Sequence, residues 1–62
     1  MNYIVMSKSG LVYLDENNVN TYSLNNAKRF PKAGDAMRTC ADVNKKLGVI
    51  TFKIFPIYDS IS

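Results

Sequence analysis

The most regular apolar pattern in this sequence lies between Pro31 and Gly48. Apolar residues recur there every three or four positions, which is the spacing of one helical face. They are Ala33, Ala36, Met37, Cys40, Val43 and Leu47. Proline disfavours helix at the residue before it, and glycine suits the position just after a helix. With Lys45 and Lys46 in the last turn, where cations suit the helix dipole, the sequence predicts a helix over residues 33–47.

Two apolar runs near the start of the chain, residues 3–6 and 11–14, are rich in residues that favour strands. The four residues between them, 7–10, are small or polar and end in a glycine, which tolerates a positive φ. This arrangement predicts a β-hairpin. Because both runs have apolar residues on both faces, we expect the helix to cover one face and a partner or aromatic side chains to cover the other.

Three further segments complete the predicted architecture. The alternation over residues 19–22 is compatible with a short third strand, and Ser23 is a good N-cap for a brief helical turn over 24–28. Residues 49–55 are the most strand-like segment, and we expect Pro56 to end its hydrogen bonding, since proline cannot donate to a ladder. The sequence therefore predicts an α+β fold, in which a small antiparallel sheet packs on one main helix preceded by a short helical turn.

The chain has 62 residues, so we expect a single small domain over residues 1–62 whose own core gives marginal stability. It has no histidine and one cysteine, Cys40, which excludes an intramolecular disulfide and the roughly four ligands of a zinc site. No apolar run approaches the roughly 20 residues that span a bilayer, and the first apolar stretch is too short for a secretory signal. We expect no metal, no membrane contact and a cytoplasmic location.

No catalytic residues are predicted. The carboxylates are scattered, and no pair has the apolar flanks that acid–base catalysis requires. They are Asp15, Glu16, Asp35, Asp42 and Asp59. The sequence offers no nucleophile–base pair and no glycine-rich phosphate loop. Cys40 lies on the apolar face of the predicted helix, which favours a small buried side chain over a reactive thiol. We therefore expect no enzymatic activity and no cofactor.

Positive charge is concentrated in the middle of the chain. The formal net charge is +3, and residues 27–53 carry seven basic and two acidic residues, which favours an acidic partner. The candidate patch consists of Lys28, Arg29, Lys32 and Arg38. The alternative is an ordinary solvated helix surface, because Arg38 stands at ion-pair spacing from both Asp35 and Asp42, and such pairs would neutralise part of the patch.

The aromatic residues divide into two groups. Phe30 and Phe52 are expected in the core of so small a domain. Tyr13, Tyr22 and Tyr58 are candidates for partner contact, because tyrosine is a rigid anchor in protein interfaces. Base stacking is disfavoured, since the sequence lacks the glycine-rich, aromatic-interleaved strand of an RNA-recognition module.

A series of core positions extends over about residues 3–54. It consists of Tyr3-Ile4-Val5-Met6-Ser7, Gly10-Leu11-Val12-Tyr13-Leu14, Tyr22, Ala27-Lys28-Arg29-Phe30 and Ala36. This series resembles a class of very small bacteriophage accessory proteins, which have a hairpin, a segment close to A-K-x-F-x-x-x-x-x-A, a helix and a closing strand. The chain departs from that pattern at Pro31-Lys32, where a capping Asp and Ser are common, and in its longer tail over residues 55–62.

Proteins of that class include inhibitors of bacterial immune systems and other host-takeover factors, and they usually act by binding. The resemblance implies a non-enzymatic protein that binds and inhibits a bacterial host protein, such as an anti-phage defence component, in the cytoplasm of the host cell. The alternative is a small nucleic-acid-binding regulator that uses the basic surface of residues 28–46. The surplus of apolar residues on both strand faces also predicts a homodimer.

Overall fold

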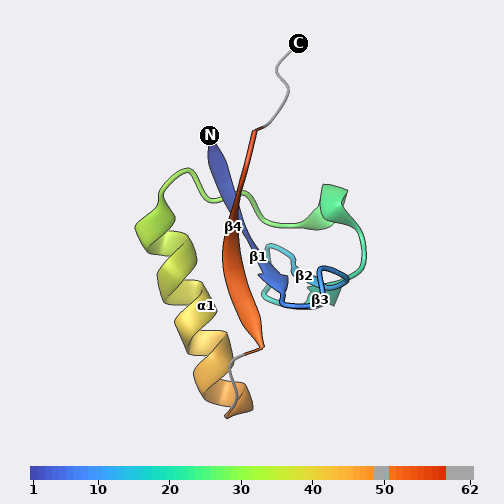
Figure 1. The fold of residues 1–62 in the computed structure, drawn as a ribbon, viewed down its shortest axis with the longest axis vertical. Helices are drawn as coiled ribbons and strands as arrows, with labels where there is room; N and C mark the ends of the chain where they lie inside the picture. The colour runs from blue at the N-terminus through green and yellow to red at the C-terminus, as the bar shows by residue number, and fades with distance from the viewer. Residues whose placement is uncertain (49–50, 59–62) are drawn as a thin grey trace.

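The computed structural model describes residues 1–48 and 51–58, in which four strands form one antiparallel sheet with the order β3-β2-β1-β4 (Figure 1). The elements are β1 (Asn2–Ser7), β2 (Tyr13–Leu14), β3 (Asn20–Thr21), the 3₁₀ helix η1 (Leu24–Asn26), α1 (Ala33–Leu47) and β4 (Phe52–Ile57). The α-helix packs beside β1 and β4. The predicted α+β fold is confirmed. Within the described residues, neither helix is long and apolar enough to cross a membrane.

The main helix has the predicted bounds, Ala33–Leu47. Gly48 ends it in the left-handed conformation, with φ of 76°, and its N–H donates to the carbonyl oxygens of Asn44 and Lys45. Ala36 and Cys40 are buried against the sheet, as their spacing predicts. The predicted apolar face is nevertheless too wide. Met37 and Leu47 are 58% and 54% exposed, because the part of α1 that contacts the sheet is a narrow stripe along its small residues.

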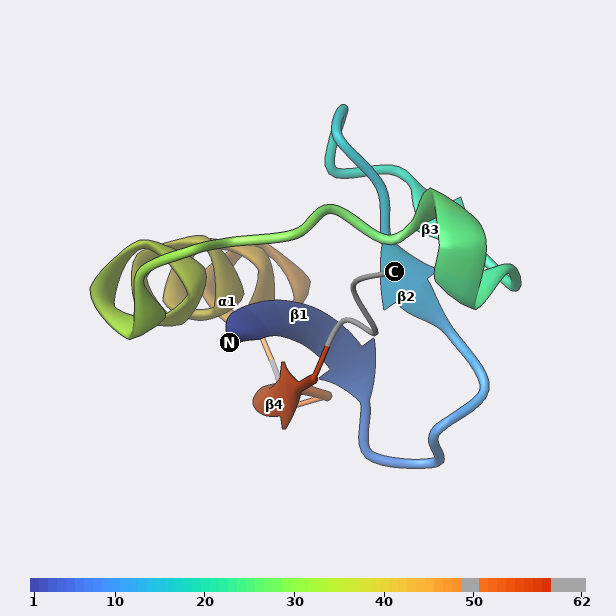
Figure 2. The same cartoon turned by 90° about the horizontal axis from the view of Figure 1, so that it is seen from above.

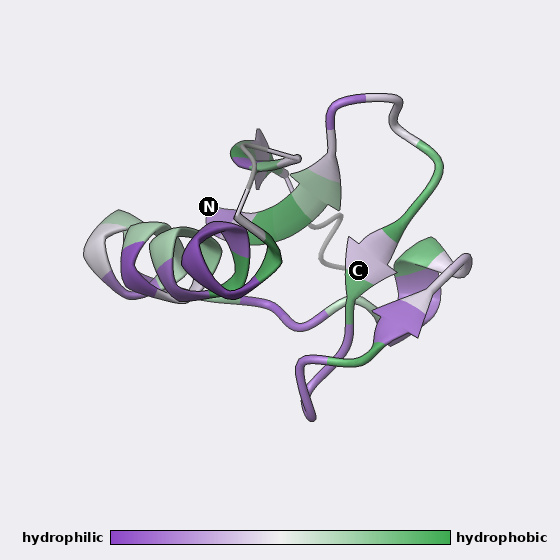
Figure 3. Ribbon diagram, turned by 90° about the horizontal axis from the view of Figure 1, so that it is seen from below, coloured by the Kyte–Doolittle hydropathy of each residue, from purple (hydrophilic) through white to green (hydrophobic). Residues whose placement is uncertain are grey.

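The core lies between α1 and the central strand β1. Val5 is fully buried on the face of β1 that α1 covers, and it joins a cluster of buried side chains. The other members of that cluster are Leu14, Phe30, Ala36, Cys40 and Phe52. Both phenylalanines expected in the core are therefore there. Figure 3 shows the hydrophobic middle of β1 beside α1, whereas β3 and most of the turn that precedes it are hydrophilic.

The hairpin forms, but its second strand is shorter than predicted. Gly10 makes the expected turn with a φ of 79°, and its N–H donates to the carbonyl oxygen of Ser7. The Ser7 hydroxyl then accepts a hydrogen bond from the N–H of Val12 at 3.2 Å. This side-chain contact extends the turn through Val12, and Leu11 is exposed. Only Tyr13 and Leu14 of the predicted strand over residues 11–14 pair as a strand.

The prediction that Pro56 ends the last strand is wrong, because β4 continues through it to Ile57. Pro56 stands opposite Tyr3 in the register. The N–H and C=O of Tyr3 point the other way and bond Phe30 across distances of 2.8 and 2.9 Å. No hydrogen bond is therefore lost at the proline, which lies in an edge strand where proline is tolerated. The predicted start of this strand, at residues 49–50, lies outside the described residues.

An extended segment over residues 27–32 connects η1 to α1 (Figure 2). It pairs with β2 through the N–H of Lys28, which donates to the carbonyl oxygen of Leu14 at 3.0 Å, and with β1 through Phe30. The predicted helical turn is shorter, Leu24–Asn26, and the Ser23 side chain does not cap it. Instead, the carbonyl oxygen of Ser23 accepts a hydrogen bond from the N–H of Asn26.

Candidate binding site

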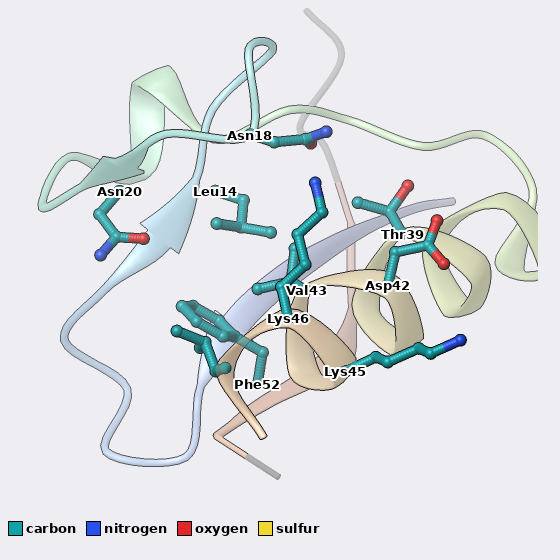
Figure 4. Close-up of a pocket in the computed structure, with 10 residues that line it drawn as sticks. Leu14, Asn18, Asn20, Thr39, Asp42, Val43, Lys45, Lys46 and Phe52 are labelled. Carbon is teal, nitrogen blue, oxygen red and sulfur yellow. The ribbon is translucent and has the colours of Figure 1, made fainter. Parts of the chain in front are cut away.

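A cleft of about 700 Å³ lies between the C-terminal half of α1 and the turn that joins β2 to β3 (Figure 4). Its floor is apolar and consists of Leu14, Val43 and Phe52, with the exposed Leu47 at one side. Its rim is polar and consists of Asn18, Asn20, Thr39, Asp42, Lys45 and Lys46. An apolar floor with a few polar groups at the mouth is the common composition of a ligand site.

The turn that forms one wall of the cleft is held by Asp15. The Asp15 Oδ1 accepts hydrogen bonds from the N–H groups of Asn17 and Val19 at 2.8 and 2.9 Å. The backbone N–H of Asp15 also donates to the carbonyl oxygen of Val19. Asn18 adopts a φ of 59°, which asparagine tolerates better than most residues. These bonds fix the turn and place the Asn18 side chain at the cleft rim (Figure 4).

The apolar residues that line the cleft include both buried and exposed side chains. Leu14 and Phe52 come from β2 and β4 and are almost fully buried, so they form a firm base. Val43 is partly buried on α1, one turn before Leu47, which is the exposed apolar residue at the end of the helix. An apolar side chain that enters the cleft therefore contacts the core below and Leu47 at one side.

Two lysines lie on the rim, and they point in different directions. Figure 4 shows Lys46 extending from α1 toward Asn18, whereas Lys45 is directed away from the cleft. Within residues 1–48 and 51–58, Lys46 has no ion-pair partner, although Asp42 precedes it by four residues. Its ammonium group is therefore available to a carboxylate or a carbonyl oxygen that a ligand brings.

Two of the four predicted basic residues interact with their own chain. The ammonium of Lys28 lies 4.9 Å from the centre of the Phe30 ring, a cation–π contact. The Arg29 Nη1 donates to the carbonyl oxygens of Leu24 and Ala27 at 2.9 and 2.8 Å. Arg29 also lines a hollow of about 490 Å³ together with Glu16. These contacts reduce the capacity of both cations to bind a partner.

The other two predicted basic residues, Lys32 and Arg38, are exposed at the start and in the first half of α1. The ion pairs that helical spacing offers to Arg38, with Asp35 and with Asp42, are not formed within 4.0 Å in the described structure.

The three candidate tyrosines are not brought together. Tyr22, just after β3, and Tyr58, just after β4, are 82% and 81% exposed, whereas Tyr13 in β2 is partly buried. Tyr13 stands opposite Met6 in β1, but the end of β4 that leads to Tyr58 pairs with Asn2. Tyr13 and Tyr58 therefore lie near opposite ends of β1, whereas Tyr22 follows Thr21, which stands opposite Tyr13.

A shallower groove of about 380 Å³ lies between α1 and β4, and Cys40 lines it beside Met37, Lys53 and Ile54. The Cys40 Sγ donates to the carbonyl oxygen of Phe52 at 3.1 Å. Burial raises the pKa of the Cys40 thiol above its ordinary value, and a hydrogen bond from Asn44 lowers it in part. Both observations match the predicted buried small side chain. No cluster of three potential metal ligands occurs among the residues that the structure describes.

Sequence reasoning missed most of the cleft. The exposed side of Leu47 has no local signal, and the sequence identifies Lys46 as one of the basic residues of 28–46 and as a cation near the helix end, with no indication of a cleft. The sign available in the sequence was the pair of asparagines in the turn after β2, since asparagine accepts left-handed backbone and so indicates a tight, outward-facing turn.

Comparison of the sequence and the structure with protein-family models, with curated proteins and with solved structures finds no match.

Proposed function

We propose that this chain is a non-enzymatic protein that binds and inhibits a bacterial host protein, with an anti-phage defence component as the expected kind of target. The observation that carries the proposal is the cleft between α1 and the β2–β3 turn. It offers an apolar floor, the free ammonium of Lys46 and the side-chain amide of Asn18 to a segment of the partner. These groups recognise and hold a ligand, and inhibition follows from occupying the partner's surface.

A protein partner is better supported than a nucleic acid. The phosphate backbone requires several cations on one surface. Lys28 and Arg29, two of the predicted basic residues, make contacts within their own chain. The exposed rings of Tyr22 and Tyr58 supply the kind of anchor that protein interfaces favour. A nucleic-acid regulator that uses residues 28–46 is kept as the competing outcome of the test.

We also propose that the protein acts as a homodimer in the cytoplasm of the host cell. The support for self-association lies on the face of the sheet away from α1. The register places Met6 opposite Tyr13, and Ile4 opposite Phe55. Since Val5 faces α1, its neighbours Ile4 and Met6 face away from it, and their partners across the strands do the same. Ile4 is already buried by its own chain, but Met6, Tyr13 and Phe55 on this face are partly exposed, and a second copy would cover them.

The test is an affinity pull-down from a nuclease-treated bacterial lysate with matched variants of two exposed residues of α1. Leu47→Gln removes apolar surface from the cleft, and Met37→Gln makes a comparable change outside it. We expect a stoichiometric host protein to be recovered with the unmodified chain and with Met37→Gln, and to be depleted with Leu47→Gln.

Two results would contradict the proposal. If only nucleic acid is recovered, and its binding falls steeply with salt, the nucleic-acid regulator replaces it, because each phosphate contact on duplex DNA lowers log affinity by about 0.9 per log unit of salt. If a host protein is recovered equally with Leu47→Gln and the unmodified chain, the cleft is not the site.

A further inference from the structure

We infer that the cleft recognises an acidic residue of the partner next to an apolar one. This inference rests on the proposed function and specifies its ligand. The apolar side chain would occupy the floor over Leu14, Val43 and Phe52. The neighbouring carboxylate would lie at the rim, between the Lys46 ammonium and the Asn18 amide (Figure 4).

The geometry of Lys46 carries the choice of an acidic residue. Its side chain points toward Asn18, and no carboxylate of the described residues pairs with its ammonium. An ammonium has three donors and no acceptor, and the Asn18 amide can donate as well. Two donors that converge above an apolar floor match a carboxylate, which only accepts hydrogen bonds.

The charge of the surroundings agrees with this choice. Of the two rim lysines, Lys46 extends toward Asn18 and Lys45 is directed away from the cleft; the rim carries one carboxylate, Asp42, and the formal charge of the whole chain is +3. Asp42 lies one helical turn before Lys46 and disfavours a second carboxylate at that end of the rim. The rim therefore attracts one acidic group near Lys46 and favours a backbone N–H or a neutral donor near Asp42.

The probes for this inference are two acetylated and amidated pentapeptides, Gly-Glu-Leu-Glu-Gly and Gly-Gln-Leu-Gln-Gly. The first places a carboxylate on each side of an apolar residue, so the direction in which it binds does not matter. Binding is measured by titration of the ¹⁵N-labelled protein, followed through the backbone amide shifts of Leu14, Asn18, Val43 and Lys46. We expect the Glu peptide to bind about three to five times more tightly than the Gln peptide, the range of a partly exposed ion pair.

Two neighbouring lysines supply the matched control. Lys46→Gln should remove the preference for the Glu peptide, whereas Lys45→Gln, an equal change of charge at a side chain directed away from the cleft, should retain it. The preference should also shrink at about 1 M NaCl, where the Debye length is about 3 Å.

Equal affinity for the two peptides would overturn the inference and leave the proposed function standing, provided that both shift the cleft residues. Loss of the preference in Lys45→Gln as complete as in Lys46→Gln would also overturn it, because the effect would then be one of net charge. The inference is also overturned if neither peptide shifts the backbone amide signals of the cleft residues. The pull-down with Leu47→Gln tests the proposed function separately.

Discussion

The side-chain amide of Asn44 in α1 pairs with the backbone of Phe52 in β4. Its Nδ2 donates to the carbonyl oxygen of Phe52 at 3.0 Å, and its Oδ1 accepts the N–H of Phe52 at 2.9 Å. The same Oδ1 accepts the N–H of Thr51 at 3.0 Å. A neighbouring antiparallel strand would make the same two bonds to Phe52. Asn44 therefore takes the place of a strand at the start of the β4 edge and ties α1 to the sheet.

Replacement of Asn44 by alanine should destabilise the fold by about 1–3 kcal/mol, because partly buried backbone groups lose their partners. The change is measured as the free energy of unfolding in urea. Asn25→Ala, in the exposed 3₁₀ helix, is the control and should change the stability by less than about 0.5 kcal/mol. If Asn44→Ala unfolds at the same urea concentration as the unmodified protein, the pairing with Phe52 contributes nothing to stability.

The edge of β4 is closed at a second point by Pro56, which has no N–H to offer to an added strand. A homodimer should therefore form through the face of the sheet away from α1 and not through this edge. Light scattering at tens of micromolar is expected to give twice the chain mass of 7.0 kDa. Met6→Gln, on the face away from α1, should shift the equilibrium toward the monomer.

A monomer at that concentration in the unmodified protein would contradict the homodimer. A dimer that Met6→Gln leaves intact would place the contact elsewhere. Circular dichroism of the variant shows whether the fold is retained, which separates a lost contact from lost structure.

The core assignment gives a third prediction. Replacing either Phe30 or Phe52 with alanine should cost about 3–5 kcal/mol, because both rings are buried in the core cluster. In a domain of 62 residues that loss is enough to unfold the chain. Tyr22→Ala removes an aromatic ring that is mostly in solvent and should leave the thermal midpoint nearly unchanged. A wild-type midpoint in either phenylalanine variant would show that the core lies elsewhere.

The fold was predictable where the signals were local. Pro31 and Gly48 delimit α1, and their effects act on the residues next to them, so the bounds agree with the structure. The prediction for Pro56 was wrong because a strand can continue through a proline where its missing N–H has no partner, and at this position that depends on the distant Phe30. The N–H and C=O of Tyr3 form hydrogen bonds with Phe30 on the other side of β1. Pro56, which stands opposite Tyr3 in β4, therefore needs no N–H to pair with β1. Such a relationship between three segments has no trace in the sequence around any one of them.

The site was less predictable than the fold. Lys45 and Lys46 are neighbours with the same charge, and the sequence cannot say which of them points toward the cleft. The answer depends on where the β2–β3 turn lies relative to α1. Leu14 fixes that position by accepting a hydrogen bond from Lys28, in the segment that leads to the helix. Charge counting therefore identified the basic middle of the chain but not the lysine that meets the apolar floor.

The buried thiol of Cys40 gives a prediction about pH. Burial raises its pKa in the folded protein above the ordinary value of 9.0, so folding favours the protonated thiol. Below pH 9.0 the thiol is protonated in both states, and this contribution to stability is fully present. As the pH rises above 9.0, the unfolded chain loses the proton first, and the contribution is lost up to the pKa of the folded state. The free energy of unfolding in urea should therefore fall more steeply above pH 9.0 than in Cys40→Ala. Every other titratable group is common to both proteins, so the difference between the two profiles isolates Cys40. Parallel profiles would show that the thiol titrates alike in the folded and unfolded states.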